Sequence, residues 1–201
     1  IKQRYFEEEI SNEVNLSYSD NQVTVTTDYL TLVYTLNSEG YASQCVYSLS
    51  SQNRIYQFSY SAEGYLTGIV ENIDNTEYSS TSLTYENGDI TSISSKMNGL
   101  ENKFIYEPGE ESSTYHLPCL GLLEIHPLTF HIEALYAGLL GKDPRHFTMH
   151  SCPAGSNDEK TVYSYGFDKK GNPSRMICQT TYAGGQASYY PYTRNISISF
   201  E

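Results

Sequence analysis

The sequence predicts an all-β fold, an antiparallel up-and-down meander of about 12 strands that coils into a barrel or half-open barrel. Tyr occurs 20 times among the 201 residues, and Ser, Thr and Asn are frequent, which favours strands and turns over helices. Apolar and polar residues alternate along many segments, and glycines recur at a constant spacing. The length allows one domain, so we expect residues 1–201 to form a single β domain.

The glycines belong to a repeated motif. In each copy, aromatic or apolar residues two positions apart lead into a polar turn that ends in glycine, after which the alternation resumes. Gly40, Gly64 and Gly88 are 24 residues apart, and a later copy ends at Gly171. This period fits two strands of about seven residues and two turns, so each copy is expected to be one hairpin with its connection to the next. Glycine ends the turn because it adopts positive φ without a Cβ clash.

The alternating segments predict strands with one buried face. Within residues 55–60, Tyr56, Phe58 and Tyr60 share a face, and residues 196–200 repeat the pattern. A meander of this length does not stay flat, because strand twist accumulates and free edges expose unpaired backbone groups. We therefore expect the sheet to coil or close.

The alternation stops in an insert over residues 110–157. Apolar residues spaced three or four apart predict a helix around 128–140, with Pro127 in its first turn and Gly141 at its C-terminal cap. Such a helix is expected to cover a barrel mouth or an exposed sheet edge, because its apolar stripe then leaves water together with the strands' surface.

Charge and hydropathy exclude several partners. The chain has 12 Lys and Arg against 24 Asp and Glu, a net charge of −12, so a nucleic-acid backbone would be repelled. No apolar stretch is long enough for a membrane-spanning helix. Short strands with Ser, Thr and Asn on their outer faces also oppose a barrel embedded in lipid. We expect no membrane span within this chain.

The tandem Tyr-x-Tyr…Gly units, residues 136–146 and residues 163–171 together resemble a family of exported Bacteroidetes lipoproteins of unknown function with a porin-like fold. The resemblance extends from about Tyr34 to Phe200. It implies export by a signal peptide and lipid attachment at a cysteine upstream of Ile1. It implies no reaction, ligand or catalytic position. The last copy departs from the motif, because Gly171 is followed by Asn172 instead of an aromatic residue.

The insert also contains residues of the types that bind zinc. All five histidines lie within it, accompanied by two cysteines, at His116, Cys119, His126, His131, His146, His150 and Cys152. Ligand pairs from the two ends of the insert could close a tetrahedral site, which favours a zinc-dependent hydrolase as the alternative function. The familiar Cys-x-x-Cys and His-Glu-x-x-His spacings are absent, and histidines in loops commonly serve as hydrogen-bonding groups.

The four cysteines leave several pairings open. Cys119 and Cys152 bracket the predicted helix and could form a disulfide at its base, or both could be buried thiols. Cys45 and Cys178 lie in opposite halves of the meander, so they could meet only if the ends of the sheet come together.

The sequence favours a non-enzymatic binding or interaction module, a lipoprotein of the cell envelope or cell surface. It has no Gly-x-Ser-x-Gly elbow and no phosphate-binding loop, and it predicts no catalytic or metal-ligating residue and no cofactor. Tyr189, Tyr190 and Tyr192 could form an aromatic surface that stacks on sugars or accepts a partner. The expected partner is an envelope protein or a glycan.

Overall fold

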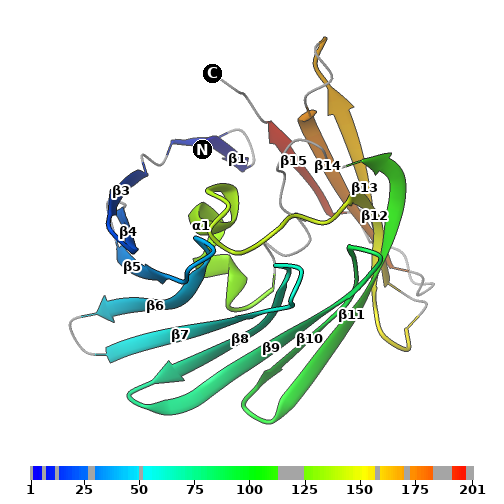
Figure 1. The fold of residues 1–201 in the computed structure, drawn as a ribbon. Coiled ribbons are helices and arrows are strands. Elements are labelled where there is room, and N and C mark those ends of the chain that lie inside the picture. Colours follow the sequence, from blue (N-terminus) through cyan, green and yellow to red (C-terminus); the bar gives the residue numbers. More distant parts are fainter. Residues whose placement is uncertain are drawn as a thin grey trace.

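The structure is a computed structural model, and Figure 1 shows its fold. It describes residues 2–5, 8–11, 14–26, 30–49, 52–112, 125–156, 159–169, 173–182 and 192–197. The strands are β1 (Lys2–Tyr5), β2 (Glu8–Ser11), β3 (Asn15–Ser19), β4 (Gln22–Thr26), β5 (Thr31–Leu36), β6 (Ala42–Leu49), β7 (Gln52–Tyr60), β8 (Leu66–Ile73), β9 (Thr76–Glu86), β10 (Asp89–Met97), β11 (Leu100–Ser112), β12 (His146–Pro153), β13 (Glu159–Phe167), β14 (Pro173–Tyr182) and β15 (Tyr192–Ser197). The helices are η2 (Leu128–Phe130), a 3₁₀ turn, and α1 (Ile132–Tyr136).

The main sheet confirms the predicted antiparallel meander. Its 13 strands run in sequence order from β3 to β15, each antiparallel to the next, and β1 and β2 form a separate hairpin. The sheet is curled but open: β3 and β15 are its two ends, and β1 lies beside β15 (Figure 1). Several strands are longer than the expected seven residues, with 11 in β9 and 13 in β11.

The repeated glycines adopt the predicted conformation. Gly40, Gly64 and Gly88 have φ values of 86°, 92° and 88°, which an L-residue rarely adopts. They lie in the turns β5–β6, β7–β8 and β9–β10, which the antiparallel order places on the same rim of the sheet. We call this the glycine rim.

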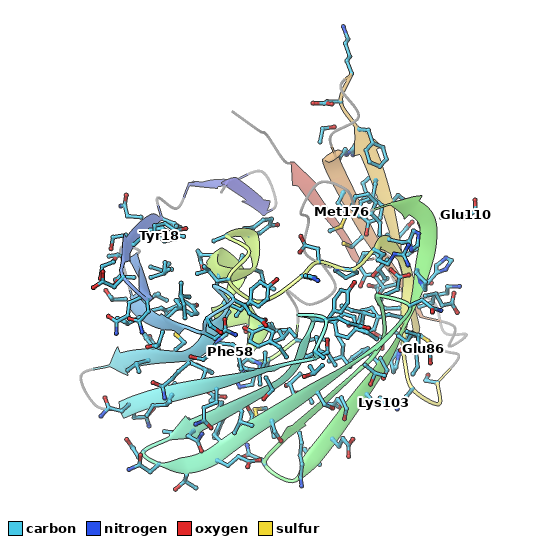
Figure 2. All side chains as sticks on the ribbon, viewed as in Figure 1. Tyr18, Phe58, Glu86, Lys103, Glu110 and Met176 are labelled. Carbon is cyan, nitrogen blue, oxygen red and sulfur yellow. The ribbon has the colours of Figure 1, made fainter. Side chains whose placement is uncertain are left out.

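The concave face of the sheet carries the core. Val23, Tyr34, Cys45 and Tyr56 are register partners on four successive strands, and all four are fully buried. Phe58 points to the same side, toward the middle of the molecule (Figure 2). Alternation along each strand thus places one set of side chains inside the curl, as the sequence predicts.

Residues 125–138 of the insert lie inside this curl (Figure 1), whereas the sequence suggested that the helix would cover a mouth or an edge. The insert is also shorter than expected, because β11 continues to Ser112 and β12 resumes the sheet at His146. We call residues 125–138 the plug. Its apolar side chains belong to the same buried cluster as those of the strands, among them Ile125, Leu128, Ala134 and Leu135.

Only five of the 13 residues in the helix predicted over 128–140 are α-helical, and three more form a 3₁₀ turn. A 3₁₀ turn and a single turn of α-helix are separated by His131, whose φ of −123° lies outside the helical range. Gly138, with φ 71°, ends α1, where Leu139 N–H donates to Ala134 O and Gly138 N–H donates to Leu135 O. This is a Schellman cap, so Gly138 and not Gly141 is the C-terminal glycine. Among the described residues, no helix has the length and hydropathy needed to cross a bilayer.

Residues 139–145, which we call the strap, run along the glycine rim. Ala42 N–H donates to Leu139 O (2.7 Å), Lys142 N–H donates to Gly64 O (2.9 Å) and Arg145 N–H donates to Gly88 O (3.0 Å). The three strap residues are three positions apart, about 10 Å in an extended chain, and two strand spacings also measure about 10 Å. Three residues of strap therefore match one 24-residue repeat of the sheet.

The three described cysteines form no disulfide across the sheet. Cys45 and Cys178 are both present as thiols, in agreement with an open sheet, and Cys152 is also a thiol. Cys119 lies outside the described residues, as do Tyr189 and Tyr190 of the predicted aromatic surface. Tyr192 begins β15, and the structure describes only its backbone.

The strap predicts the effect of substituting Gly141. Its φ is +90°, and an added Cβ would lie 2.7 Å from the carbonyl oxygen of Gly64. Gly99→Ala is the matched control, because Gly99 has φ +77° with no atom near its Cβ position. Positive φ costs each variant about 1–2 kcal/mol, and we expect Gly141→Ala to lose at least about 1 kcal/mol more in urea denaturation, because backbone must move. Equal losses for the two variants would contradict the strap contact.

Candidate functional site

The main cluster of charged groups in the described interior is centred on Glu71. This side chain is fully buried on β8, and both of its carboxylate oxygens are occupied. Arg54 Nη1 donates to Oε1 (2.9 Å), whereas Ser79 Oγ donates to Oε2 (2.8 Å). His126 Nε2, from the plug, also binds Oε2 at 2.5 Å. The carboxylate thus joins three segments of the chain: β7, β9 and the plug.

These contacts keep Glu71 ionised in spite of its burial. Burial favours the neutral acid and raises the pKa of Glu71, but the hydrogen bonds from His126 and Ser79 and the positive charges nearby outweigh it. The net direction is a pKa below the usual value for glutamate. A buried carboxylate of this kind is stabilised only while its partners remain in place.

The backbone of the plug is attached next to this carboxylate. The carbonyl oxygen of His126 accepts hydrogen bonds from Thr81 Oγ1 (3.0 Å) and Ser95 Oγ (3.2 Å), on β9 and β10. His126 therefore binds the concave face through both its ring and its backbone. The segment before η2 cannot move from the sheet without breaking these bonds together.

A second histidine, His131, is buried entirely among aromatic rings. Its Nδ1 is hydrogen-bonded to the Tyr34 hydroxyl at 2.8 Å, and its Nε2 is buried with no hydrogen-bond partner among the described residues. The rings of Tyr56 and Phe58 meet it nearly perpendicularly, at centroid distances of 4.4 and 5.3 Å. Burial lowers the pKa of His131 to about 3, although the charge of Glu71 acts in the opposite direction. His131 is therefore neutral at physiological pH.

Its neighbours are also kept neutral by burial. Burial raises the pKa of the Tyr34 hydroxyl, and it raises the pKa of the Cys45 thiol to about 12. The nucleophilic form of a cysteine is the thiolate, so Cys45 is an inert thiol. The part of the core around His131 is polar in composition but carries no charge, which suits a packing role and not proton transfer.

Arg54 is held on several sides at the end of the Glu71 cluster. Its guanidinium carbon lies 5.9 Å from the ring centroids of both Tyr78 and Phe130. The Tyr56 hydroxyl lies close to Arg54 and Glu71, but within the described part of the chain neither this hydroxyl nor Arg54 Nε has a well-aligned hydrogen bond. Burial and the charge of Glu71 raise the pKa of Tyr56. About a fifth of the Arg54 side chain remains open to solvent.

The other histidines of the predicted zinc set are bound elsewhere. His146 donates its backbone N–H to Asp89 Oδ1 and binds Oδ2 through Nδ1, each at 2.8 Å, while His150 Nδ1 lies 3.1 Å from Glu107 Oε2. His116 and Cys119 fall outside the described residues. Within the part of the chain that the structure describes, no three metal-binding side chains come together.

Sequence reasoning missed Arg54, Glu71 and Tyr78. A signal for Glu71 was present, because it alternates with Ile69 and Ile73 and so places a carboxylate on the apolar face of a strand. A charge in that position is expected only if a partner neutralises it. The identity of the partners could not be read, because His126 lies 55 positions away in the chain.

Comparison with known proteins gives a family and a fold. A family model described as "Domain of unknown function (DUF4595) with porin-like fold" matches residues 2–175. A porin-like protein from Bacteroides uniformis ATCC 8492 is similar in structure, with a TM-score of 0.86 and 25% identity over 100% of this chain and 83% of that chain. A porin-like protein from Bacteroides vulgatus ATCC 8482 shares the fold, with a TM-score of 0.66 and 12% identity over 100% of this chain and 96% of that chain. No curated protein matches.

Removing the charge of Glu71 tests its role as the central acceptor. We expect Glu71→Gln to lower the free energy of unfolding by about 3 kcal/mol, because a buried ion pair broken on one side leaves uncompensated groups. Glu101→Gln is the control, since Glu101 is exposed and accepts a hydrogen bond from the Ser94 hydroxyl at the surface, so its loss should cost less than about 0.5 kcal/mol. Urea denaturation of both variants measures the difference, and similar losses would show that the Glu71 cluster is not a stabilising centre.

The lowered pKa of His131 predicts that the folded protein loses stability in mild acid. The pKa of His131 in the folded chain, about 3, lies below the usual value of 6.5. Between these two pH values the unfolded chain binds a proton at His131 and the folded chain does not. The free energy of unfolding is therefore unaffected by this proton above pH 6.5, and it falls by about 1.4 kcal/mol per pH unit as the pH drops from 6.5 toward 3. His131→Phe has no such proton. We expect urea denaturation between pH 6 and 5 to show a smaller pH slope for His131→Phe than for the wild type, and equal slopes would contradict this account.

Proposed function

The chain belongs to the porin-like DUF4595 family, and from this membership and its geometry we propose that it is a non-enzymatic binding module of the bacterial cell envelope. The proposal includes export and attachment at the outer membrane or cell surface, with an envelope protein or a glycan as partner. The similar structures come from Bacteroides and are described as porin-like, which supports an envelope location.

The observation that carries the proposal is the plug. The concave face between β5 and β10 is occupied by the chain's own residues 125–138, which are buried against it and bonded to it. The interior of the described sheet is thereby committed to packing, as in a rigid scaffold. Such a domain presents its outer surface and rims to partners, in the way that binding modules commonly do.

The chemistry-bearing side chains of the interior support a non-enzymatic role. Both oxygens of Glu71 are occupied, His131 is kept neutral by burial, and Cys45 is held as a thiol. A general acid or base must reach a substrate proton, and a nucleophile must reach an electrophile. These three groups are instead engaged in holding the plug and the sheet together.

Fractionation of cells that produce the natural full-length protein tests the location and the binding role. We expect a tagged protein to sediment with the envelope and the purified domain of residues 1–201 to bind isolated envelope material. Binding should be saturable, because a folded module offers a limited number of sites. A tagged protein found in the cytoplasm, or a purified domain that does not bind envelope material, would overturn the proposal.

A further inference from the structure

Four side chains form a compact group of rings and nitrogen donors at the rim opposite the glycine rim, near the starts of β7 and β9. Arg54 on β7 lies 5.9 Å from the ring centroids of Tyr78 on β9 and Phe130 in η2. The His126 ring meets those of Tyr78 and Phe130 edge-on, at centroid distances of 6.1 and 5.7 Å. We call these four residues the Arg54 platform.

The Arg54 platform is partly exposed. Phe130 is 37% exposed, and its neighbours Arg54 and His126 have side chains that are 21% and 26% exposed. Phe130 is among the few large apolar residues that the described surface leaves exposed. It differs from the exposed Leu100, at the tip of the β10–β11 hairpin, because two nitrogen-bearing side chains stand beside it. An aromatic ring exposed next to fixed polar groups is a common feature of contact surfaces.

The nitrogen groups of the Arg54 platform are already fixed in position. Arg54 donates to one carboxylate oxygen of Glu71, and His126 and Ser79 both bind the other oxygen. A ligand would therefore not have to order a free arginine side chain, a cost that ordinarily reduces affinity. The Arg54 platform is preorganised by the same carboxylate that anchors the plug.

Charge selects the class of ligand. Glu71 offsets the charge of Arg54, and the whole chain carries −12, so an acidic sugar, a phosphate or a polyanion gains little and is repelled at a distance. A neutral sugar has no such penalty. Its C–H face packs on an aromatic ring, and its hydroxyls accept hydrogen bonds from guanidinium or imidazole N–H groups.

The position of Glu71 bears on whether such a sugar would be cleaved. Most glycoside hydrolases use a pair of carboxyl groups that reach the scissile bond. Glu71 is fully buried, and both of its oxygens already accept hydrogen bonds. We propose that the Arg54 platform binds a neutral hexose unit of a polysaccharide without cleaving it, an inference that rests on the proposed function and names its ligand class.

Affinity electrophoresis and calorimetry with the purified chain test this inference. The probes are the neutral polysaccharides dextran, mannan and laminarin, with polygalacturonate as the acidic comparison. We expect binding to at least one neutral probe, no binding to polygalacturonate and no release of reducing ends. Phe130→Ala should weaken that binding by about tenfold or more, because it removes the exposed ring against which the sugar packs. Leu100→Ala, which removes an even more exposed apolar side chain elsewhere on the sheet, should leave the affinity unchanged.

Arg54→Lys provides a second variant that separates charge from geometry. It retains the positive charge but loses the planar guanidinium, so we expect weaker sugar binding with the protein still folded by urea denaturation. The inference is overturned by a wild-type chain that binds none of the neutral probes, by stronger binding to polygalacturonate, or by full affinity in Phe130→Ala.

Envelope binding distinguishes failure of this inference from failure of the proposed function. If Phe130→Ala binds isolated envelope material as well as the wild type does while neutral probes are not bound, the Arg54 platform is not the site and the binding module stands. If the wild type binds neither envelope material nor any probe, both are overturned.

Discussion

The structure depends on covering the concave face of a curled 13-stranded sheet. Alternation along the strands directs one row of side chains inward on every strand, and an apolar surface of that extent is not stable in water. Between β5 and β10 the chain covers this face with its own residues 125–138. This requirement accounts for the interruption of the meander between β11 and β12, and for a segment rich in apolar residues within a chain that is otherwise polar.

The plug is positioned by polar contacts as well as by apolar packing. Apolar contacts are not directional, so they would allow the plug several positions on the sheet. Glu71 specifies one, because its buried charge is satisfied only when Arg54, Ser79 and His126 are all in place. His131 adds a second constraint through its bond to Tyr34. The same contacts that fix the plug also arrange the Arg54 platform, so stability and the proposed binding surface share one carboxylate.

The strap depends on the same 24-residue repeat that sets the hairpins, because it bonds to their turns. Turns at Gly40, Gly64 and Gly88 line one rim because each joins two strands of a sheet whose neighbours are antiparallel and in sequence order. Their backbone groups are then spaced regularly enough for an extended segment to bond to them at every third residue. Where an aromatic residue follows the glycine, it packs on the next hairpin, as Tyr41 does on Tyr60 and Tyr65 on Tyr85. After Gly88 this place is taken by Asp89, which binds His146 at the start of β12.

The sequence by itself determined the strands, their antiparallel order and the glycine turns, because alternation and turn chemistry are local properties that act over a few residues. It also placed the insert, although the local helix pattern overstated the helix: tertiary packing turned His131 into the core and Gly138 ended the α-helical turn. Only the tertiary structure decided that the insert enters the curl and that Glu71 meets Arg54 and His126. Those pairings join residues 17 and 55 positions apart, and nothing in the local sequence around any one of them records which partner the folded chain will bring to it.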